Sequence, residues 1–328
     1  ILIALAFLVD TLSGNGGAGA EYGSKAPLAK MLKDIGGQAF GLFVPVLAGY
    51  IAYSISERAA LAAGLVAGAI ATAGGSGFIG ALLGGFLAGY VVQGLVKALS
   101  GMPRSLSGLK MILLYPVLSV LITGVAMVLV INPFAAIINN GLNAWLNGMS
   151  GSSAVLLGAV LGGMMAIDMG GPVNKAAYVF GSGTLAATMT SGGSLPMAAV
   201  MAGGMVPPIA IALASQIFKN KFTEQEKEAG LTNYIMGLSF ITEGAIPYAA
   251  ADPARIIPAS VIGSAITGAL VGLFQIKIPA PHGGILVMGL SKNAAGHSGF
   301  LMYLIAILIG SIIAAIVLGF LKPSIKKD

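Results

Sequence analysis

Long apolar runs, separated by short polar or glycine-rich breaks, make up most of this chain. Several runs reach the roughly 20 residues that a helix needs to cross a bilayer. The clearest contains Pro116, where we expect a kink. The runs of spanning length are 35–55, 78–99, 109–131, 195–218, 256–274 and 299–321. Because a helix satisfies all its backbone polar groups within one segment in lipid, the pattern predicts an all-α polytopic membrane protein.

Other apolar segments are too short or too interrupted to span a bilayer. They are 59–73, 153–167, 176–189, 233–251 and 285–290. Paired short segments in a membrane protein are typical of re-entrant hairpins that face one binding site. We therefore predict two such hairpins, at 168–188 and 233–251.

The segment 132–150 differs from both kinds of run. Its apolar residues recur at helical spacing with asparagines between them, and it holds the only tryptophan, Trp145. This pattern predicts an amphipathic helix in the membrane interface. We interpret it as a crossover between two halves. The predicted divisions are 1–131, 132–152 and 153–328, with polar loops at 10–34 and 219–232 and with residues 1–9 as the end of a longer helix.

Composition supports the membrane assignment. Hydrophobic residues make up 57% of the chain and charged residues 9%, whereas a soluble domain carries roughly 25% charged residues. The net charge of +6 does not indicate nucleic-acid binding, because the basic residues lie at the ends of apolar runs. The positive-inside rule then predicts a cytoplasmic C-terminus, although Lys25, Lys30 and Lys33 fall on the other side.

Motifs for self-contained catalysis are absent from the sequence. There is no cysteine and there are two histidines, so disulfides are excluded and few side chains remain to bind a transition metal. No P-loop, zinc-protease or serine-hydrolase motif occurs. We therefore expect no metal, no cofactor and no complete active site, and the sequence favours a permeation pathway.

Glu243 is the strongest candidate for a binding residue. A charge at membrane depth costs roughly 2.5 to 3.5 kcal/mol on insertion scales, so such residues usually face a cavity, a partner or a substrate. Gly244 and Pro247 follow closely and indicate a broken backbone with free carbonyls. We predict that Thr242 and Glu243 bind substrate, with Glu243 accepting hydrogen bonds from hydroxyls or taking a proton. The structural alternative is a carboxylate that caps a half-helix.

The run DMGGPVNK at 168–175 is the second candidate. Its glycines permit a tight bend, and its proline suits the first turn of the next helix. Asn174 offers both donors and acceptors, and we predict it as a ligand. Asp168 either joins the site or pairs with Lys175 and holds the hairpin. The predicted hairpin residues are Gly170, Gly171, Pro172, Lys175 and Pro247.

A third candidate is His282, which lies between Pro281 and a pair of glycines. An imidazole can donate to and accept from hydroxyl groups, so we predict His282 and Gly283 as substrate-binding residues. The alternative is a histidine whose nitrogens are satisfied by loop carbonyls.

Together, FITEGAIPY at 240–248, DMGGPVNK at 168–175 and PHGG at 281–284 resemble the membrane IIC component of the bacterial phosphoenolpyruvate-dependent sugar phosphotransferase system, in its fructose-specific branch. The resemblance covers essentially the whole chain. It implies about ten transmembrane helices, two re-entrant hairpins, an amphipathic crossover and a homodimer. It also implies an elevator-type motion of a transport half past a scaffold half. The motif glutamate falls on Glu243, the family histidine on His282, and the matching run places Asp168 and Asn174 in or near the site.

The resemblance implies a permease of the bacterial inner membrane, surrounded by lipid, that binds fructose or a similar sugar. A phosphorylated IIB module would then phosphorylate the sugar, and only that complex would act as a phosphotransferase. Two alternatives stay open from the residues themselves. One is an ion- or proton-coupled transporter that uses Glu243 or Asp168, and the other is an intramembrane enzyme with these two acids as a pair, although no activated nucleophile is evident.

Overall fold

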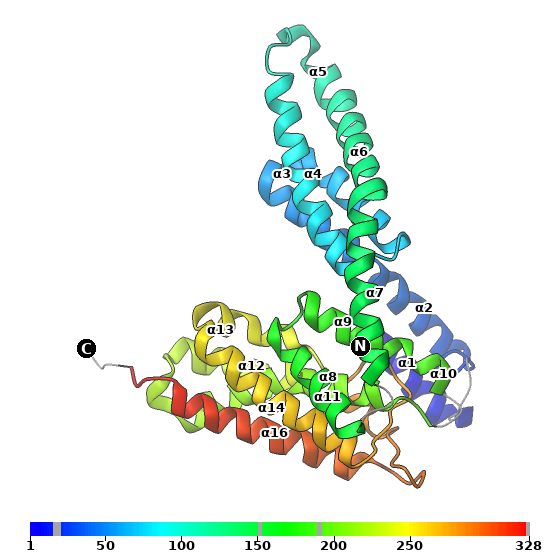
Figure 1. The fold of residues 1–328 in the computed structure, drawn as a ribbon, viewed down its shortest axis with the longest axis vertical. Coiled ribbons are helices and arrows are strands. Elements are labelled where there is room, and N and C mark those ends of the chain that lie inside the picture. Colours follow the sequence, from blue (N-terminus) through cyan, green and yellow to red (C-terminus); the bar gives the residue numbers. More distant parts are fainter. Residues whose placement is uncertain (16–20, 150–152, 189–191, 326–328) are drawn as a thin grey trace. The chain divides into compact units, whose positions relative to one another are not determined.

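The computed structural model describes residues 1–15, 21–149, 153–188 and 192–325. Within these residues the fold is helical (Figure 1), with isolated β-bridges and no strand, which confirms the all-α prediction. The main helices are α1 Leu2–Asp10, α2 Pro27–Gly41, α3 Phe43–Ala73, α4 Gly77–Ala98, α5 Ser107–Leu109, α6 Tyr115–Ala126, α7 Asn132–Met149, α8 Ala154–Ile167, α9 Pro172–Gly183, α10 Leu185–Thr188, α11 Leu195–Ile217, α12 Glu224–Leu238, α13 Ile246–Ala251, α14 Pro253–Leu273, α15 Ile285–Met288 and α16 Phe300–Leu321.

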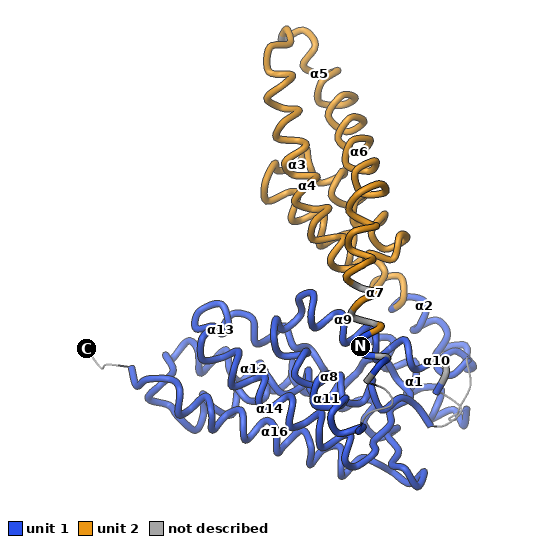
Figure 2. Tube along the Cα trace, viewed as in Figure 1, with its two compact units in different colours: residues 1–36, 145–328 blue, residues 37–144 orange. Residues whose placement is uncertain are grey.

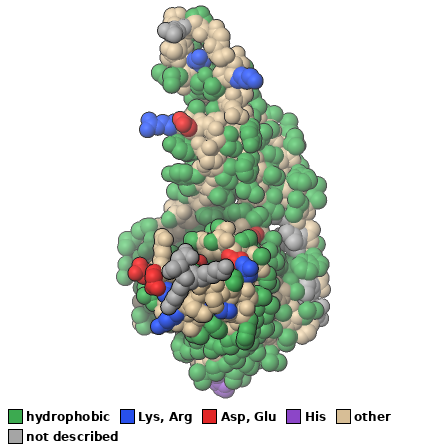
Figure 3. All heavy atoms as spheres, turned by 90° about the vertical axis from the view of Figure 1, so that its left-hand side faces the viewer, with side chains coloured by type: hydrophobic (Ala, Val, Ile, Leu, Met, Phe, Trp, Pro, Cys, Tyr) green, Lys and Arg blue, Asp and Glu red, His purple; other side chains and the backbone are tan. Residues whose placement is uncertain are grey.

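Six helical segments of the described chain are long and apolar enough to cross a membrane. They are Pro27–Ala73, Gly77–Ala98, Ser107–Ile138, Leu195–Ile217, Pro253–Leu273 and Phe300–Leu321. On the face drawn in Figure 3, apolar side chains predominate and charged side chains gather in a few small groups. These features agree with the predicted polytopic membrane protein.

Two compact units make up the chain (Figure 2): residues 37–144, and residues 1–36 together with 145–328. Residues 1–36 pack in the same unit as residues 145–328. Within that unit the buried Asp10 carboxylate accepts backbone N–H bonds from Gly23, Lys25 and Ala26 at 2.7, 3.0 and 2.6 Å. Asp10 therefore ties α1 to the segment that leads into α2.

In the unit 37–144, small residues let helices approach closely. Helix α3 folds back at Ser56 and Glu57, where φ of Glu57 is 50°. The stretch after this point matches the predicted run 59–73, whereas the predicted run 35–55 is divided between the end of α2 and the first stretch of α3. A Cβ added to Gly64 would lie 2.7 Å from the carbonyl oxygen of Ala48. Such contact distances leave room only for glycine, which is how membrane helices commonly pack.

Two predicted loops prove to be partly helical. The expected loop 10–34 contains the start of α2 at Pro27, and the expected loop 219–232 contains the start of α12 at Glu224. A capping box starts α12: the Thr223 hydroxyl accepts the N–H of Glu226 at 3.1 Å, and the Glu226 carboxylate accepts the N–H of Thr223 at 2.8 Å. High polarity concealed this helix because its first turn is charged and solvated.

The C-terminal unit is built around α11, which packs against α8, α14 and α16. Helices α8 and α14 run antiparallel, since Gly158 lies against Gly268 and Gly272 lies against Ala154. A Cβ on Gly158 would lie 2.2 Å from the carbonyl oxygen of Gly268, so this contact also depends on glycine.

Helix α11 contains Pro207 and Pro208, which carry no N–H to donate to the carbonyls four residues before them. Those two buried carbonyls receive hydroxyl donors from elsewhere in the unit. The donors are Ser264 Oγ to Gly203 O and Thr242 Oγ1 to Gly204 O, each at 2.8 Å. The double proline therefore fixes α11 to α14 on one carbonyl and to the segment that carries Glu243 on the other.

Candidate functional site

The turn between α8 and α9 forms one side of the candidate site. It places Met169 at φ 48° and Gly170 at φ 135°. The Asp168 carboxylate accepts the N–H groups of Val173 at 2.7 Å and Asn174 at 3.0 Å, and thereby caps α9. The Asn174 side chain, 2% exposed, donates to the carbonyl oxygen of Met165 at 2.8 Å. These bonds hold the turn, which begins α9 at Pro172.

The segment between α12 and α13 forms the opposite side. After Leu238 the chain passes through Phe240, at φ 60°, into the short 3₁₀ turn Thr242–Ala245. Thr242 is buried and its hydroxyl is held by the carbonyl of Gly204. Pro247 lies in the first turn of α13, where a missing N–H costs nothing.

Glu243 is the residue at which the two sides meet. Its Oε1 lies 3.2 Å from Nζ of Lys175, in an ion pair whose side chains are 43% and 24% exposed. A Cβ on Gly170 would lie 3.0 Å from Cγ of Glu243. Gly170 is therefore required both by its positive φ and by the space that Glu243 occupies. The sequence suggested Asp168 as a partner of Lys175, and the structure shows an ion pair of Lys175 with Glu243.

His282 lies close to the same segment. Its ring centroid is 4.8 Å from that of Phe240 and 6.4 Å from that of Tyr178. Its Nδ1 is buried without a hydrogen-bond partner among the described residues. Burial lowers the pKa of His282, which lies outside the six apolar helical segments, so the imidazole is neutral near pH 7. A neutral ring with a buried, unsatisfied nitrogen suits a hydroxyl-bearing ligand.

Glycines fit the His282 loop against its neighbours. Gly283 has φ 128°, and a Cβ there would lie 2.4 Å from Cβ of Ala4 in α1. Gly284 has φ 54°, and its added Cβ would lie 2.1 Å from the carbonyl oxygen of Leu238. The predicted ligand Gly283 thus packs against the Ala4 side chain, and Gly284 lies against the backbone at the end of α12.

One face of α9 unites these groups. Lys175 and Tyr178 are three residues apart and so lie on the same side of the helix, with Lys175 toward Glu243 and Tyr178 toward His282. The candidate site therefore comprises Lys175, Tyr178, Phe240, Glu243 and His282. Sequence analysis missed Tyr178 and Phe240 as site residues. The helical spacing from Lys175 was a signal that could have found Tyr178.

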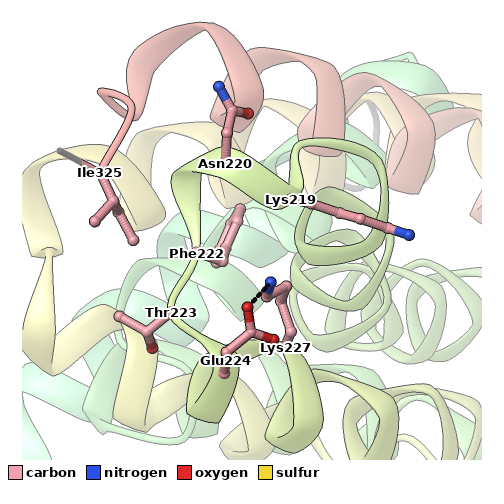
Figure 4. Close-up of a pocket in the computed structure, with 7 residues that line it drawn as sticks. All are labelled: Lys219, Asn220, Phe222, Thr223, Glu224, Lys227 and Ile325. Carbon is pink, nitrogen blue, oxygen red and sulfur yellow. Dashed lines mark hydrogen bonds and ion pairs between the residues drawn. The ribbon is translucent and has the colours of Figure 1, made fainter. Parts of the chain in front are cut away.

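The described residues of the C-terminal unit also line hollows, of which one adjoins the α8–α9 turn and another lies near the C-terminus. A cavity of about 240 Å³ adjoins Asp168 and is otherwise apolar; its lining residues are Ile167, Asp168, Met169, Ile246, Ala249, Ala250 and Ile257. A larger pocket of about 480 Å³ (Figure 4) is lined by Lys219, Asn220, Phe222, Thr223, Glu224, Lys227 and Ile325, and includes the 2.6 Å ion pair of Lys227 with Glu224. No cluster of three histidine or acidic side chains suited to a metal occurs in the described part of the chain.

Comparison with known proteins gives a consistent picture. The family model "Phosphotransferase system, EIIC" matches residues 1–263. The chain is 48% identical over 326 residues to the "PTS system fructose-specific EIIABC component" of Bacillus subtilis (strain 168), which covers 99% of this chain and 49% of that protein. It is 49% identical over 289 residues to the "Fructose permease IIC component" of Bacillus amyloliquefaciens, covering 88% of this chain and 91% of the relative.

A third relative has a further module in its name. The chain is 52% identical over 296 residues to the "PTS system fructose-specific EIIB'BC component" of Escherichia coli (strain K12), which covers 90% of this chain and 51% of the relative. The chain therefore spans about half the length of several curated relatives that it matches.

Proposed function

Because the chain belongs to the EIIC family of the phosphotransferase system, we propose that it is a membrane permease that binds and translocates fructose, or a similar sugar, for phosphorylation by a IIB module. The observation that carries this proposal is the meeting of the segment that carries Phe240 and Glu243 with the α8–α9 turn and the His282 loop. A half-exposed carboxylate and a neutral imidazole with a free nitrogen offer hydrogen bonds to several hydroxyls at once.

The packing of α8 and α9 supports a re-entrant hairpin. Helix α8 has 14 residues and is therefore about 21 Å long, shorter than the roughly 30 Å of bilayer hydrocarbon. Helix α9 then leads back to the start of α11, where Thr184 contacts Ser194. The turn at Asp168–Gly171 would thus end inside the membrane.

A second hairpin would enter from the other face. Helix α12 begins near the far end of α11, with Gly230 against Ser215, and runs back along α11 to place Gly237 against Ile209. Helix α13 returns to that end, where the Tyr248 hydroxyl donates to the carbonyl oxygen of Glu226. In this arrangement the tips of two hairpins from opposite faces meet at Glu243.

The remaining parts of the proposal follow the family. We assign about ten membrane passages in all, with α7 as the amphipathic crossover and residues 37–144 as the scaffold of a homodimer. The C-terminal unit would carry sugar across by an elevator-type motion, with the C-terminus in the cytoplasm. The end of the unit that carries the C-terminus is rich in lysines, as cytoplasmic ends of membrane proteins are. These lysines are Lys219, Lys221 and Lys322.

We assign direct sugar contacts to Glu243 and His282, and supporting roles to four other predicted residues. Asp168 and Asn174 shape the first turn, Thr242 fixes the Glu243 segment to α11, and Gly283 positions the His282 loop. The rings of Tyr178 and Phe240 would pack against the apolar faces of the sugar.

The test is fructose binding by the purified full chain in detergent, without a phosphoryl donor. Glu243→Gln should weaken binding by about 10- to 100-fold, because a charge-assisted hydrogen bond contributes about 1.5–3 kcal/mol. Glu224→Gln, which removes an exposed carboxylate on α12, is the matched control and should bind normally. Equal affinity of both variants for fructose would refute the role of Glu243.

A proton-coupled transporter is the rival from the sequence, and the structure offers it little support. Asp168 is engaged by two N–H groups of α9, and Glu243 is paired with a lysine. Uptake into vesicles should therefore require phosphorylated IIB and should persist when an uncoupler abolishes the proton gradient. Uptake without a phosphoryl donor that an uncoupler abolishes would establish the rival.

A further inference from the structure

The proposed function creates an electrostatic problem at Glu243. A sugar held by this carboxylate must receive a phosphoryl group, which brings negatively charged oxygens toward a second negative group. Two like charges at contact distance repel strongly in a partly desolvated site unless a cation neutralises them. Phosphoryl-transfer sites solve this with a cationic side chain or a metal ion placed at the transferred group.

Lys175 is the basic side chain that the structure places against Glu243. Its Nζ lies 3.2 Å from Oε1 of the carboxylate. Other ion pairs of the described chain lie away from Glu243. Lys322 pairs with Glu226 at the beginning of α12 at 3.3 Å, and Arg255 pairs with Asp252 at the beginning of α14 at 3.0 Å. We propose that Lys175 binds the phosphoryl group during its transfer to the sugar and then holds the sugar phosphate.

The hairpin turns do not depend on the Lys175–Glu243 pair. The α8–α9 turn is held by the Asp168 cap and by the bond from Asn174 to Met165. The Glu243 segment is held by the bond from Thr242 to Gly204. An ion pair between two partly exposed side chains adds little stability. The Lys175 side chain is long enough for its ammonium to move a few ångströms from the carboxylate to an incoming anion.

The face of α9 also directs Lys175 toward the sugar. Tyr178, three residues later, lies beside His282, so a sugar between Glu243 and His282 would lie along this face. The Lys175 ammonium would then be at one end of the sugar and the imidazole near the other. The hydroxyl that receives the phosphoryl group is the one at the Glu243 end.

The chemical step balances with the groups present and a phosphorylated IIB side chain as co-reactant. The sugar hydroxyl loses its proton to Glu243, its oxygen forms the bond to phosphorus, and the bond from phosphorus to the IIB side chain breaks. The electron pair of that broken bond stays on the IIB side chain. Because protonation neutralises Glu243, the attraction between Lys175 and Glu243 weakens in the same step in which the sugar gains a phosphate. The ammonium therefore passes from carboxylate to phosphate.

This inference rests on the proposed function, and the experiment separates the two. The full chain is reconstituted with phosphorylated IIB, and two quantities are measured: the fructose Kd without a donor, and the single-turnover rate of phosphoryl transfer at saturating fructose. Lys175→Met should keep the Kd within about threefold and lower the rate by about 100-fold or more, as for loss of one transition-state charge contact. Lys175→Arg should retain most of the rate. Lys219→Met, an exposed lysine at the 480 Å³ pocket, is the control.

A Lys175→Met rate within about threefold of the unchanged protein would overturn the proposal. A weaker Kd with an unchanged rate at saturation would also overturn it, because Lys175 would then serve sugar binding only. If the methionine variant does not fold, Lys175→Gln decides by the same two quantities: the proposal requires a lower rate at an unchanged Kd, and a changed Kd at full rate contradicts it. Failure of the unchanged protein to bind fructose would instead refute the proposed function.

Discussion

Replacing Thr242 with valine would remove one hydroxyl from behind Glu243 while keeping the volume of the side chain. That hydroxyl donates at 2.8 Å to the carbonyl of Gly204, which Pro208 cannot serve. Both groups are buried, so the carbonyl would be left without a donor. An unsatisfied buried polar group costs about 1–3 kcal/mol, and we expect Thr242→Val to lower the free energy of unfolding by that amount.

Fructose affinity should fall as well, because the Thr242 bond fixes the residue next to Glu243. The matched control is Ser264→Ala, which removes the hydroxyl from the neighbouring carbonyl of Gly203. Ser264→Ala should lower the free energy of unfolding by a similar amount. It should leave fructose affinity unchanged, because Ser264 lies on α14 and not on the segment that carries Glu243. Unfolding is followed by denaturant titration in mixed micelles, and affinity by equilibrium binding.

A double-mutant cycle tests the cause of this loss. Pro208→Ala restores a backbone N–H that can donate to the Gly204 carbonyl within α11. In that background Thr242→Val should therefore lower the free energy of unfolding by about 1 kcal/mol less than in the unchanged protein. Equal costs of Thr242→Val in both backgrounds would refute the explanation that the two prolines create the need for these hydroxyls.

Two further predictions concern the contacts of Glu243 and His282. Gly170→Ala should leave the protein in the membrane but reduce fructose uptake by about tenfold or more, because Gly170 has φ 135° and a Cβ would lie 3.0 Å from Cγ of Glu243. The control is Gly183→Ala, because a Cβ added to Gly183 has no neighbour within 4 Å. Equal fructose uptake by the two variants would contradict the reasoning. Because burial lowers the pKa of His282, its imidazole should stay neutral between about pH 6 and pH 8. The Kd for fructose should therefore be constant over this range. Weaker fructose binding as the pH falls through about 6.5 would show instead that His282 titrates as an ordinary histidine.

Hydropathy predicted the helices whose lengths follow from the bilayer. The run 78–99 became α4 at Gly77–Ala98, and 299–321 became α16 at Phe300–Leu321. The paired short segments also predicted where the chain would turn, because a charge followed by glycine and proline cannot continue an apolar helix. The start of helix α12 was missed because its solvated first turn gives no apolar signal.

The site could be predicted only in part. Glu243 and His282 were predicted as polar residues in apolar surroundings. In the structure His282 lies against Phe240, and Glu243 lies in the turn that follows Phe240. The ion pair of Lys175 with Glu243 was not predicted, because Glu243 is far away in sequence and is brought close only by the packing of two turns. The hydrogen bond from Thr242 to the carbonyl of Gly204 could not be predicted either, because the path of α11 determines which carbonyl lies near Thr242.

The most direct test of the account is an experimental density map of the full chain with fructose bound. The account predicts sugar density between the carboxylate of Glu243 and the ring of His282, with hydroxyls within hydrogen-bond distance of both. Sugar density in another part of the unit, such as the pocket beside Lys219, with the Glu243 segment unoccupied, would contradict it.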